Sequence, residues 1–326
     1  MYYLFAKTRF VKIAALLPAG EYTKELELIL QSFPHEVKLF TKLDEQTVEH
    51  LKEVEVLVST PFFPLTRVIL EKMAKLRFVQ CASTGYDHLD VEYLKQRGVI
   101  VSNVPDANKE SVAEHVIMVT LCILRRLEYA LQSTRNGVWV LGELASSAHE
   151  LMGKSFGILG MGRIGRQLAK RLVPFEVTTL YYDLIRLNQK EEEELGASYV
   201  TLEELFRLSD IVSIHVPLNH STHSMVNAKL LSQAKRGLIL INAARAEIVE
   251  KSALLEALEN GTLSAAALDV YENEPPNKDD PILKHPKILV TPHYAGVTWE
   301  AQRRIAHRAL ANVLLFVQGG TPVNQV

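Results

Sequence analysis

The chain of 326 residues is long enough for two domains, and its 48% apolar and 23% charged residues are typical of a globular protein with an ample core. A formal net charge of −2 gives no electrostatic reason to expect a nucleic acid or an anionic membrane as a partner. No apolar run approaches the roughly 18 residues that a membrane-spanning helix needs.

The sequence favours the cytoplasm. Its two cysteines, Cys81 and Cys122, suggest neither a disulfide framework nor a zinc site, and buried reduced thiols are the simplest interpretation. The apolar run at 13–17 is too short for the core of a signal peptide.

Short β-branched runs alternate with amphipathic helical segments along almost the whole chain, which is typical of mostly parallel sheets covered by helices on both faces. Helices are predicted at 22–31, 66–74 and 109–126, the last largely buried. The strands predicted in this first part lie at 11–17, 36–39, 54–58, 78–81 and 99–102.

A second set of strands begins at residue 156, and the chain closes with a helix predicted at about 299–317. The acidic run at 190–194 is most simply a solvated helix face. The later strands are predicted at 177–182, 211–215, 238–241, 266–270 and 288–290.

A glycine fingerprint opens this second set. Gly160, Gly162 and Gly165 form a G-x-G-x-x-G between an apolar run and a segment with helical spacing, and Asp183 ends the next strand. Gly160 permits the tight turn, Gly162 the close approach of a pyrophosphate, and Gly165 close packing of helix on strand. Asp183 would bind the ribose hydroxyls of a dinucleotide. An ordinary glycine-rich turn would not need a strand, a helix and an acid in this order.

Ionisable side chains follow the carboxyl ends of three later strands, at the edge where open α/β sheets bind ligands. Hydride transfer to a ketone needs a proton donor, and histidine suits that role near neutral pH. A carboxylate would orient and charge the histidine, and an arginine would bind a substrate carboxylate. Taken singly, each has an ordinary alternative: a surface ion pair, a solvated acid or a structural histidine. These side chains are Arg245, Glu272, Glu274 and His293.

The first set of strands lacks a glycine fingerprint. Its best-marked loop is 83–87, directly after the strand that ends at Cys81, and the N–H groups of such a loop can bind a carboxylate. An ordinary turn is an equally good explanation. His220 and His223 are three residues apart without an evident third ligand, so no metal site is predicted.

The sequence resembles the D-isomer-specific 2-hydroxyacid dehydrogenase family over essentially its whole length. The resemblance implies a Rossmann-type doubly wound parallel-sheet domain for NAD(H), 105–294, inserted in a flavodoxin-like α/β substrate domain, 1–104 plus 295–326. It implies NAD-dependent reduction of small 2-oxo acids to D-2-hydroxy acids, and a homodimer formed through about 110–150. The matching stretches are 83–88, 111–114, 157–165, 215–218, 241–245, 267–275 and 291–293.

The resemblance also implies roles for single residues. Arg245 would bind the substrate carboxylate and carbonyl, and His293 would be the general acid/base. Glu274, which directly precedes a proline, matches the family's partner of that histidine better than Glu272 does. Asp269 would hold the nicotinamide carboxamide.

The resemblance implies one group of residues that bind the substrate and another that binds the cofactor. The substrate would contact Ser83, Thr84, Gly85, Arg245 and His293. The cofactor would contact Gly160, Gly162, Arg163, Ile164, Gly165, Asp183, Val216, Pro217, Ala243 and Asp269.

Departures from the family pattern narrow the subgroup. Ala246 stands where glycine is common in the family. Thr84 stands where phosphite dehydrogenases carry lysine, and Glu274 where formate dehydrogenases carry glutamine, so both of these activities are disfavoured. Asp183 repels a 2′-phosphate and favours NAD(H), although Arg186 could tolerate that phosphate.

Two alternatives stay open. One is an NAD(H)-binding regulatory, corepressor-like scaffold. The other is a 3-phosphoglycerate dehydrogenase, although the chain leaves no room after its last motif for the regulatory domain of the long enzymes.

Overall fold

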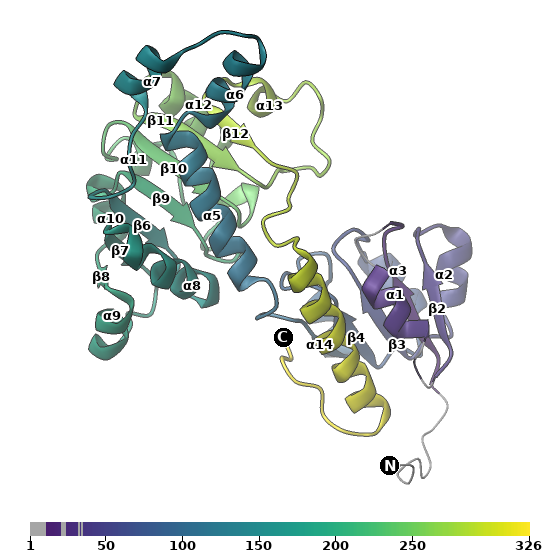
Figure 1. Cartoon of the computed structure of the whole chain (residues 1–326). Coiled ribbons are helices and arrows are strands. Elements are labelled where there is room, and N and C mark those ends of the chain that lie inside the picture. The colour runs from purple at the N-terminus through teal and green to yellow at the C-terminus, as the bar shows by residue number, and fades with distance from the viewer. Residues whose placement is uncertain (1–10, 21–23, 32, 34) are drawn as a thin grey trace. The chain divides into compact units, whose positions relative to one another are not determined.

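The computed structural model describes residues 11–20, 24–31, 33 and 35–326. Two compact units are present (Figure 1). The first combines Met1–Asn108 with Val297–Val326, and the second comprises Lys109–Gly296. The first two positions of the helix expected at 22–31 lie outside the described residues.

The first unit contains a five-stranded parallel sheet with the order β2-β1-β3-β4-β5, the flavodoxin-like order. Three of its strands are buried along their whole length, as expected of parallel strands covered on both faces. The strands are β1 (Ile13–Leu16), β2 (Val37–Phe40), β3 (Val56–Ser59), β4 (Phe78–Cys81) and β5 (Ile100–Ser102).

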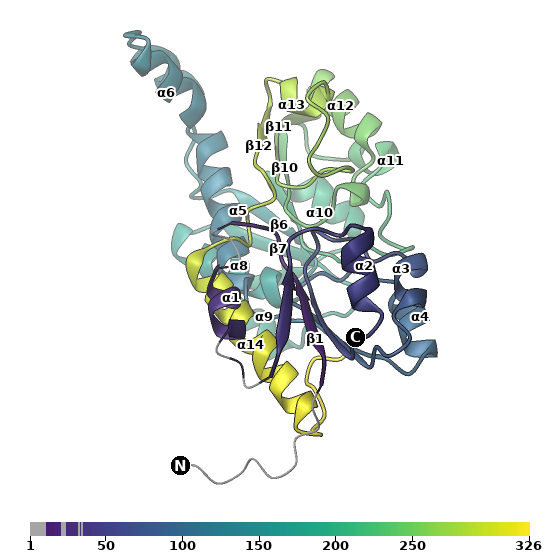
Figure 2. The ribbon, with the colours of Figure 1, turned by 90° about the vertical axis from the view of Figure 1, so that its right-hand side faces the viewer.

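Helices cover both faces of this sheet (Figure 2). The first face packs against α1 (Lys24–Gln31) and the C-terminal α14 (Trp299–Val317). The buried Asn312 of α14 donates to Gln80 Oε1 at 2.9 Å, so the last helix is tied to the middle of β4. The opposite face packs against α2 (Glu45–Leu51), α3 (Arg67–Lys72) and α4 (Val91–Gln96).

The second unit contains a seven-stranded parallel sheet with the order β12-β11-β10-β9-β6-β7-β8. The chain winds outward from β6 to β8 and then from β9 to β12, so the order reverses between β6 and β9. The two sheets confirm the predicted fold class, a Rossmann-type doubly wound domain inserted in a flavodoxin-like one. The strands are β6 (Ser155–Leu159), β7 (Thr178–Tyr182), β8 (Ala197–Tyr199), β9 (Ile211–Ile214), β10 (Leu238–Asn242), β11 (Leu263–Leu268) and β12 (Ile288–Val290).

The core of this unit forms two apolar layers, one on each face of the sheet. On one face lie α5 (Lys109–Leu124), α8 (Arg163–Leu172) and α9 (Gln189–Leu195). On the other lie α10 (Leu202–Leu208), α11 (Ala228–Leu231), α12 (Lys251–Glu259) and the short α13 (Pro281–Lys284). The remaining helices, α6 (Leu127–Arg135) and α7 (Leu141–Ser147), bury no residue.

Three expectations need correction. The short strand β8 was not predicted. Asp269 lies just after β11 and not inside it, because the strand ends at Leu268. The acidic run is not simply solvated: Glu191 and Glu192 accept hydrogen bonds from Arg166 and Arg186.

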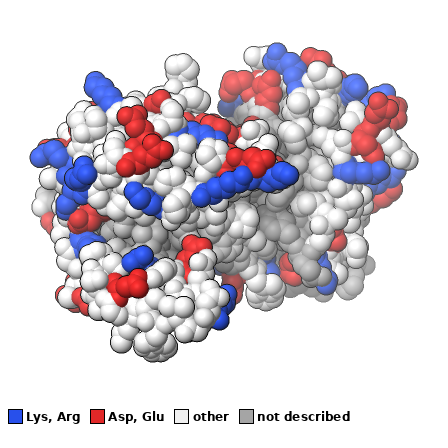
Figure 3. Space-filling view, turned by 90° about the horizontal axis from the view of Figure 1, so that it is seen from above, with Lys and Arg blue, Asp and Glu red and all other residues white. Residues whose placement is uncertain are grey.

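Within the part of the chain that the structure describes, no helix is long and apolar enough to cross a membrane. The same part contains no group of three or more histidine, cysteine or acidic side chains placed to hold a metal ion. On the face that Figure 3 shows, positive and negative side chains lie interspersed.

Candidate active site

The glycine loop is shaped by close contacts between backbones. Gly160 has φ of +102°, and a Cβ atom there would lie 2.8 Å from the carbonyl carbon of His215 and the nitrogen of Val216. A Cβ at Gly165 would overlap the carbonyl oxygen of Gly160. Both positions therefore require glycine for reasons internal to the fold.

Gly162 is different, since a Cβ there would meet no protein atom within 4 Å. It is the N-cap of α8, makes no side-chain capping bond, and no acidic residue occupies the first turn. The backbone N–H groups of that turn are the kind of donors that bind phosphate. Open space beside such donors fits a pyrophosphate. The next residues of the turn, Arg163 and Ile164, are exposed and half-buried.

Asp183 lies against this loop. Its Oδ2 accepts from Met161 N at 2.7 Å, and its Oδ1 accepts from Ile185 N at 3.3 Å. Val216 and the exposed Pro217 follow β9, across the point where the strand order reverses. The glycine loop, Val216 and Pro217 therefore lie at the switch point, where this fold binds ligands.

The side chains of His293 and Glu274 are in hydrogen-bond contact. His293 Nδ1 lies 2.5 Å from Glu274 Oε2, and Tyr271 N donates to Glu274 Oε1 at 3.1 Å. Burial raises the pKa of Glu274, but the bonds from His293 and Tyr271 and the charge of Arg245 outweigh it, so the pKa falls below the ordinary value of 4.5. The carboxylate is therefore ionised near neutral pH and can charge-pair with the imidazolium.

Asp269 fixes the loop that carries His293. It is 2% exposed and accepts from Thr291 Oγ1 at 2.6 Å, Tyr294 N at 3.0 Å and Ala295 N at 2.8 Å. A carboxylate has about four acceptor positions, so roughly one is left for a further donor such as a carboxamide. His293 has φ of +52°, a left-handed conformation that the bonds on either side of it maintain.

Arg245 follows β10 in extended conformation, before a 3₁₀ turn at Ala246–Ile248. The buried Asn242 holds this loop: its Nδ2 donates to Arg245 O at 2.8 Å, and its Oδ1 accepts from Ala244 N at 3.0 Å. The half-buried Ala243 lies between them.

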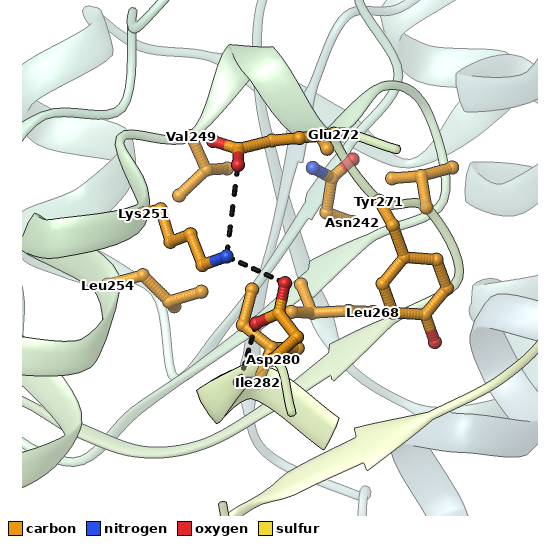
Figure 4. Close-up of a pocket in the computed structure, with 11 residues that line it drawn as sticks. Asn242, Val249, Lys251, Leu254, Leu268, Tyr271, Glu272, Asp280 and Ile282 are labelled. Atoms are coloured by element: carbon orange, nitrogen blue, oxygen red, sulfur yellow. Dashed lines mark hydrogen bonds and ion pairs between the residues drawn. The ribbon is translucent and has the colours of Figure 1, made fainter. Parts of the chain in front are cut away.

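Behind the loops lies a small pocket (Figure 4) of about 20 Å³, roughly the space of one water molecule. Lys251 Nζ lies 2.7 Å from Asp280 Oδ2 and 3.8 Å from Glu272 Oε2. Glu272 therefore pairs with a lysine of α12, whereas Glu274 pairs with His293. The pocket is too small for a substrate, and its ion pairs hold the loop that carries Glu274.

The predicted carboxylate loop belongs to the first unit. Ser83 Oγ donates to Gly85 O at 2.6 Å, and Thr84 Oγ1 lies 2.9 Å from Asn108 Oδ1. The loop follows β4, whose last residue, Cys81, is fully buried, and burial raises the pKa of its thiol to about 12. This cysteine is therefore an unreactive thiol.

Sequence reasoning missed several supporting residues. It assigned no role to Asn242, although a polar residue at the end of an apolar strand indicates a side chain that can bind the following loop. It also missed His115 on α5, which is buried and stands edge-on to the Tyr294 ring at 5.1 Å between centroids. Burial lowers the pKa of His115 against the opposing charge of Asp269. The imidazole therefore supports the His293 loop as a neutral group.

Known proteins are similar to this chain in sequence and in fold. The family model of the D-isomer specific 2-hydroxyacid dehydrogenase NAD binding domain matches residues 117–295. A glyoxylate reductase of Korarchaeum cryptofilum is 37% identical over 281 residues, covering 86% of this chain and 84% of that protein. A D-3-phosphoglycerate dehydrogenase of Bacillus subtilis is 37% identical over 255 residues, but the 78% of this chain that matches spans only 48% of that protein.

Among solved structures, the NAD-dependent formate dehydrogenase of Staphylococcus aureus in complex with NAD aligns with a TM-score of 0.85 at 34% identity, covering 96% of this chain and 98% of that one. The match of the family model over more than half of the chain, and the relatives of similar length, agree with the glycine loop and the strand order. The chain belongs to the D-isomer specific 2-hydroxyacid dehydrogenase family and carries its NAD-binding domain.

Proposed function

We propose that the protein reduces small 2-oxo acids to D-2-hydroxy acids with NADH, and that Arg245, Glu274 and His293 perform the reaction. The observation that carries the proposal is the His293–Glu274 pair, which stands within the electrostatic influence of Arg245 at the carboxyl edge of the sheet. A proton donor, its charged partner and a carboxylate binder are what carbonyl reduction requires.

NADH held at the glycine loop would supply the hydride for C2 of the oxo acid. His293 donates a proton from Nε2 to the substrate oxygen, because its Nδ1 faces Glu274. Glu274 fixes the orientation of the ring and stabilises its protonated form. Arg245 binds the substrate carboxylate through its planar fork and polarises the neighbouring carbonyl. For the first unit, we keep the prediction that Ser83, Thr84 and Gly85 bind a carboxylate.

The cofactor contacts are proposed on the same geometry. Open space at Gly162 and the N–H groups of α8 support pyrophosphate binding, with Arg163, Ile164 and Gly165 in the first turn. Asp183 accepts hydrogen bonds from the ribose hydroxyls. It favours NAD(H) over NADP(H) because it repels a 2′-phosphate. Val216, Pro217, Ala243 and Asp269 complete the site on the nicotinamide side.

The proposal is tested by turnover of glyoxylate, hydroxypyruvate, pyruvate, bulkier oxo acids and 3-phosphohydroxypyruvate with NADH, with oxidation of formate by NAD as a separate assay. We expect His293→Asn to lower kcat for reduction by about 10²- to 10⁴-fold, the usual contribution of general acid–base catalysis. His220→Asn, a histidine outside the site, should leave kcat unchanged.

A His293→Asn enzyme within a few-fold of wild type would remove His293 from the chemistry. NADH binding without turnover of any compound would favour the regulatory scaffold. Preference for 3-phosphohydroxypyruvate would favour a phosphoglycerate dehydrogenase, whose relatives this chain matches over about half of their length.

We also propose that the protein is a cytoplasmic homodimer. The two cysteines are unpaired thiols. The α6–α7 arm, residues 127–147, buries no side chain of its two helices and exposes five large apolar residues. A second copy of the chain is the occupant that would cover them.

A further inference from the structure

A basic side chain stands close to Asp183 in sequence and is held in an ion pair. Arg186 follows Asp183 by three residues, on the segment between β7 and α9. Its Nε donates to Glu192 Oε1 at 2.9 Å and its Nη2 to Glu192 Oε2 at 3.0 Å. The guanidinium carbon lies 5.5 Å from the centroid of the Tyr199 ring. Two charge-assisted bonds in a fork give this pair a defined geometry, although the Arg186 side chain is 63% exposed.

Glu192 is itself fixed. Its side chain is only 13% exposed, and its Oε1 also accepts from the hydroxyl of Tyr181 at 2.7 Å. Tyr181 is fully buried in β7, and its hydroxyl oxygen accepts from Leu187 N at 2.9 Å. The bonds from Arg186 and Tyr181 lower the pKa of Glu192, so the carboxylate stays ionised near neutral pH. Glu192 therefore cannot easily follow Arg186 toward a ligand.

We propose that Glu192 is a specificity-determining residue that withholds Arg186 from the 2′-phosphate of NADP(H). An arginine near the ribose-binding acid is the side chain that accommodates this phosphate in dinucleotide folds. Here a phosphate would have to displace a half-buried carboxylate, fixed by Tyr181, from both of its hydrogen bonds with Arg186. The discrimination that Asp183 provides by repulsion is thereby strengthened. The inference rests on the proposed function in one respect, that Asp183 faces the adenosine ribose.

The experiment is a fluorescence titration of the full-length protein with NADH and with NADPH, which reports binding without turnover. Glu192→Gln keeps an acceptor for Tyr181 but replaces one oxygen of the fork with an amide that cannot accept from Arg186. We expect the Kd for NADPH to fall about tenfold, the effect of one hydrogen bond to a charged group. The Kd for NADH should stay within about twofold of wild type.

Glu193→Gln is the matched control. It removes the same charge one residue away on α9, where Glu193 is exposed and accepts from Gln189. An equal gain in this variant would mean that net charge alone sets the preference, and the proposal would fail.

Arg186→Gln completes the test in two backgrounds. In wild type it should leave NADPH binding unchanged, because the guanidinium is already engaged, whereas in Glu192→Gln it should abolish the gain. A severalfold loss of NADPH affinity in Arg186→Gln alone would overturn the proposal. This measurement does not depend on the folding of the Glu192 variant. Absence of NADH binding by wild type would refute the proposed function, whereas NADH binding with an unmoved NADPH ratio would refute only the role of Glu192.

Discussion

At the scale of the residue, one buried carboxylate positions the acid/base candidate. A left-handed conformation at a residue other than glycine, such as that of His293, costs of the order of 1–3 kcal/mol. Hydrogen bonds to a charged acceptor contribute about 1.5–3 kcal/mol each. Asp269 accepts three such bonds from the residues on either side of His293, which is enough to offset the strain. The backbone is thus fixed by Asp269 and the ring by Glu274.

The lowered pKa of Glu274 predicts the acid side of the pH profile. A carboxyl with a lowered folded pKa is ionised above its ordinary value of 4.5 and loses its charge only as pH falls through the folded value. We therefore expect kcat/KM for oxo-acid reduction to stay flat on the acid side down to about pH 5. An inflection near pH 6 that disappears in Glu274→Gln would show instead that this pKa is raised.

The same variant has a defined effect on rate. Glu274→Gln keeps a hydrogen-bond acceptor but removes the charge that stabilises the imidazolium, so kcat for reduction should fall at least about tenfold, or 1.4 kcal/mol. The matched control is Glu272→Gln, which alters the neighbouring acid that pairs with Lys251. An equal loss in both variants would mean that the loop as a whole, and not the ion pair with His293, sets the rate.

At the scale of the element, the turn from β6 into α8 combines two kinds of glycine. Gly160 is required by the backbone at the end of β9, and Gly165 by the carbonyl of Gly160. Gly162 has no such constraint, and its φ of −76° is accessible to any residue. The packing of the protein explains two of the three glycines, and the third is explained by space reserved for a ligand.

This distinction gives a prediction. Gly162→Ala should weaken NADH binding at least about tenfold, because the added methyl occupies the space of the pyrophosphate, whereas Tm should fall by only a few degrees. Gly160→Ala should lower Tm clearly as well, because its Cβ collides with backbone and its φ is left-handed. Gly142→Ala, at another open position without a positive φ, is the control. Unchanged NADH affinity in Gly162→Ala would place the pyrophosphate elsewhere.

Elements with a local sequence signal could be predicted. Buried parallel strands appear as apolar runs. β4 and β12 were predicted residue for residue, and α14 was predicted at about its observed bounds. The three-residue β8 has no such run and forms only on pairing with β7. Its existence depends on tertiary contacts that a single sequence does not display.

The candidate site likewise contains residues that could be predicted from the sequence and contacts that could not. The strand ends that bring Arg245, Glu274 and His293 to one edge follow from topology, so the candidates could be predicted. Which of four consecutive glutamates turns toward Arg186 depends on the rotation of α9 about its axis and on the buried hydroxyl of Tyr181. These are packing details, and the expectation of a solvated run was therefore wrong for Glu192.

At the scale of the whole molecule, the chain builds two parallel sheets and crosses between its two units twice. It leaves the first unit after Asn108 and returns to it at Val297. The returning helix α14 is anchored by Asn312, which also donates to the carbonyl of Val323 at 2.9 Å, and by Arg304, which donates to Ala107 O at 2.7 Å. Contacts within the first unit therefore fix the chain close to both points at which it passes between the two units.

The exposed surface of the α6–α7 arm bears on the assembly of the protein. Monomers rarely leave a contiguous row of large apolar side chains in water, and a tryptophan in such a row is a typical anchor of an interface. Trp139 is 81% exposed and lies between α6 and α7, next to further exposed apolar residues. The exposed large apolar residues of this arm are Leu127, Leu131, Val138, Trp139 and Leu141.

We expect sedimentation equilibrium to give twice the chain mass of 36.6 kDa, 2 × 36.6 = 73.2 kDa, for the wild type. Trp139→Glu should shift the protein to the monomer without loss of helical circular dichroism, because the residue is 81% exposed in its own chain. Trp299→Glu, a 67% exposed tryptophan at the start of α14 in the first unit, should leave the dimer intact. A wild-type monomer, or a dimer that persists in Trp139→Glu, would show that this arm is not the interface. Dissociation by both variants to the same extent would show that added surface charge, and not the loss of this contact, separates the chains.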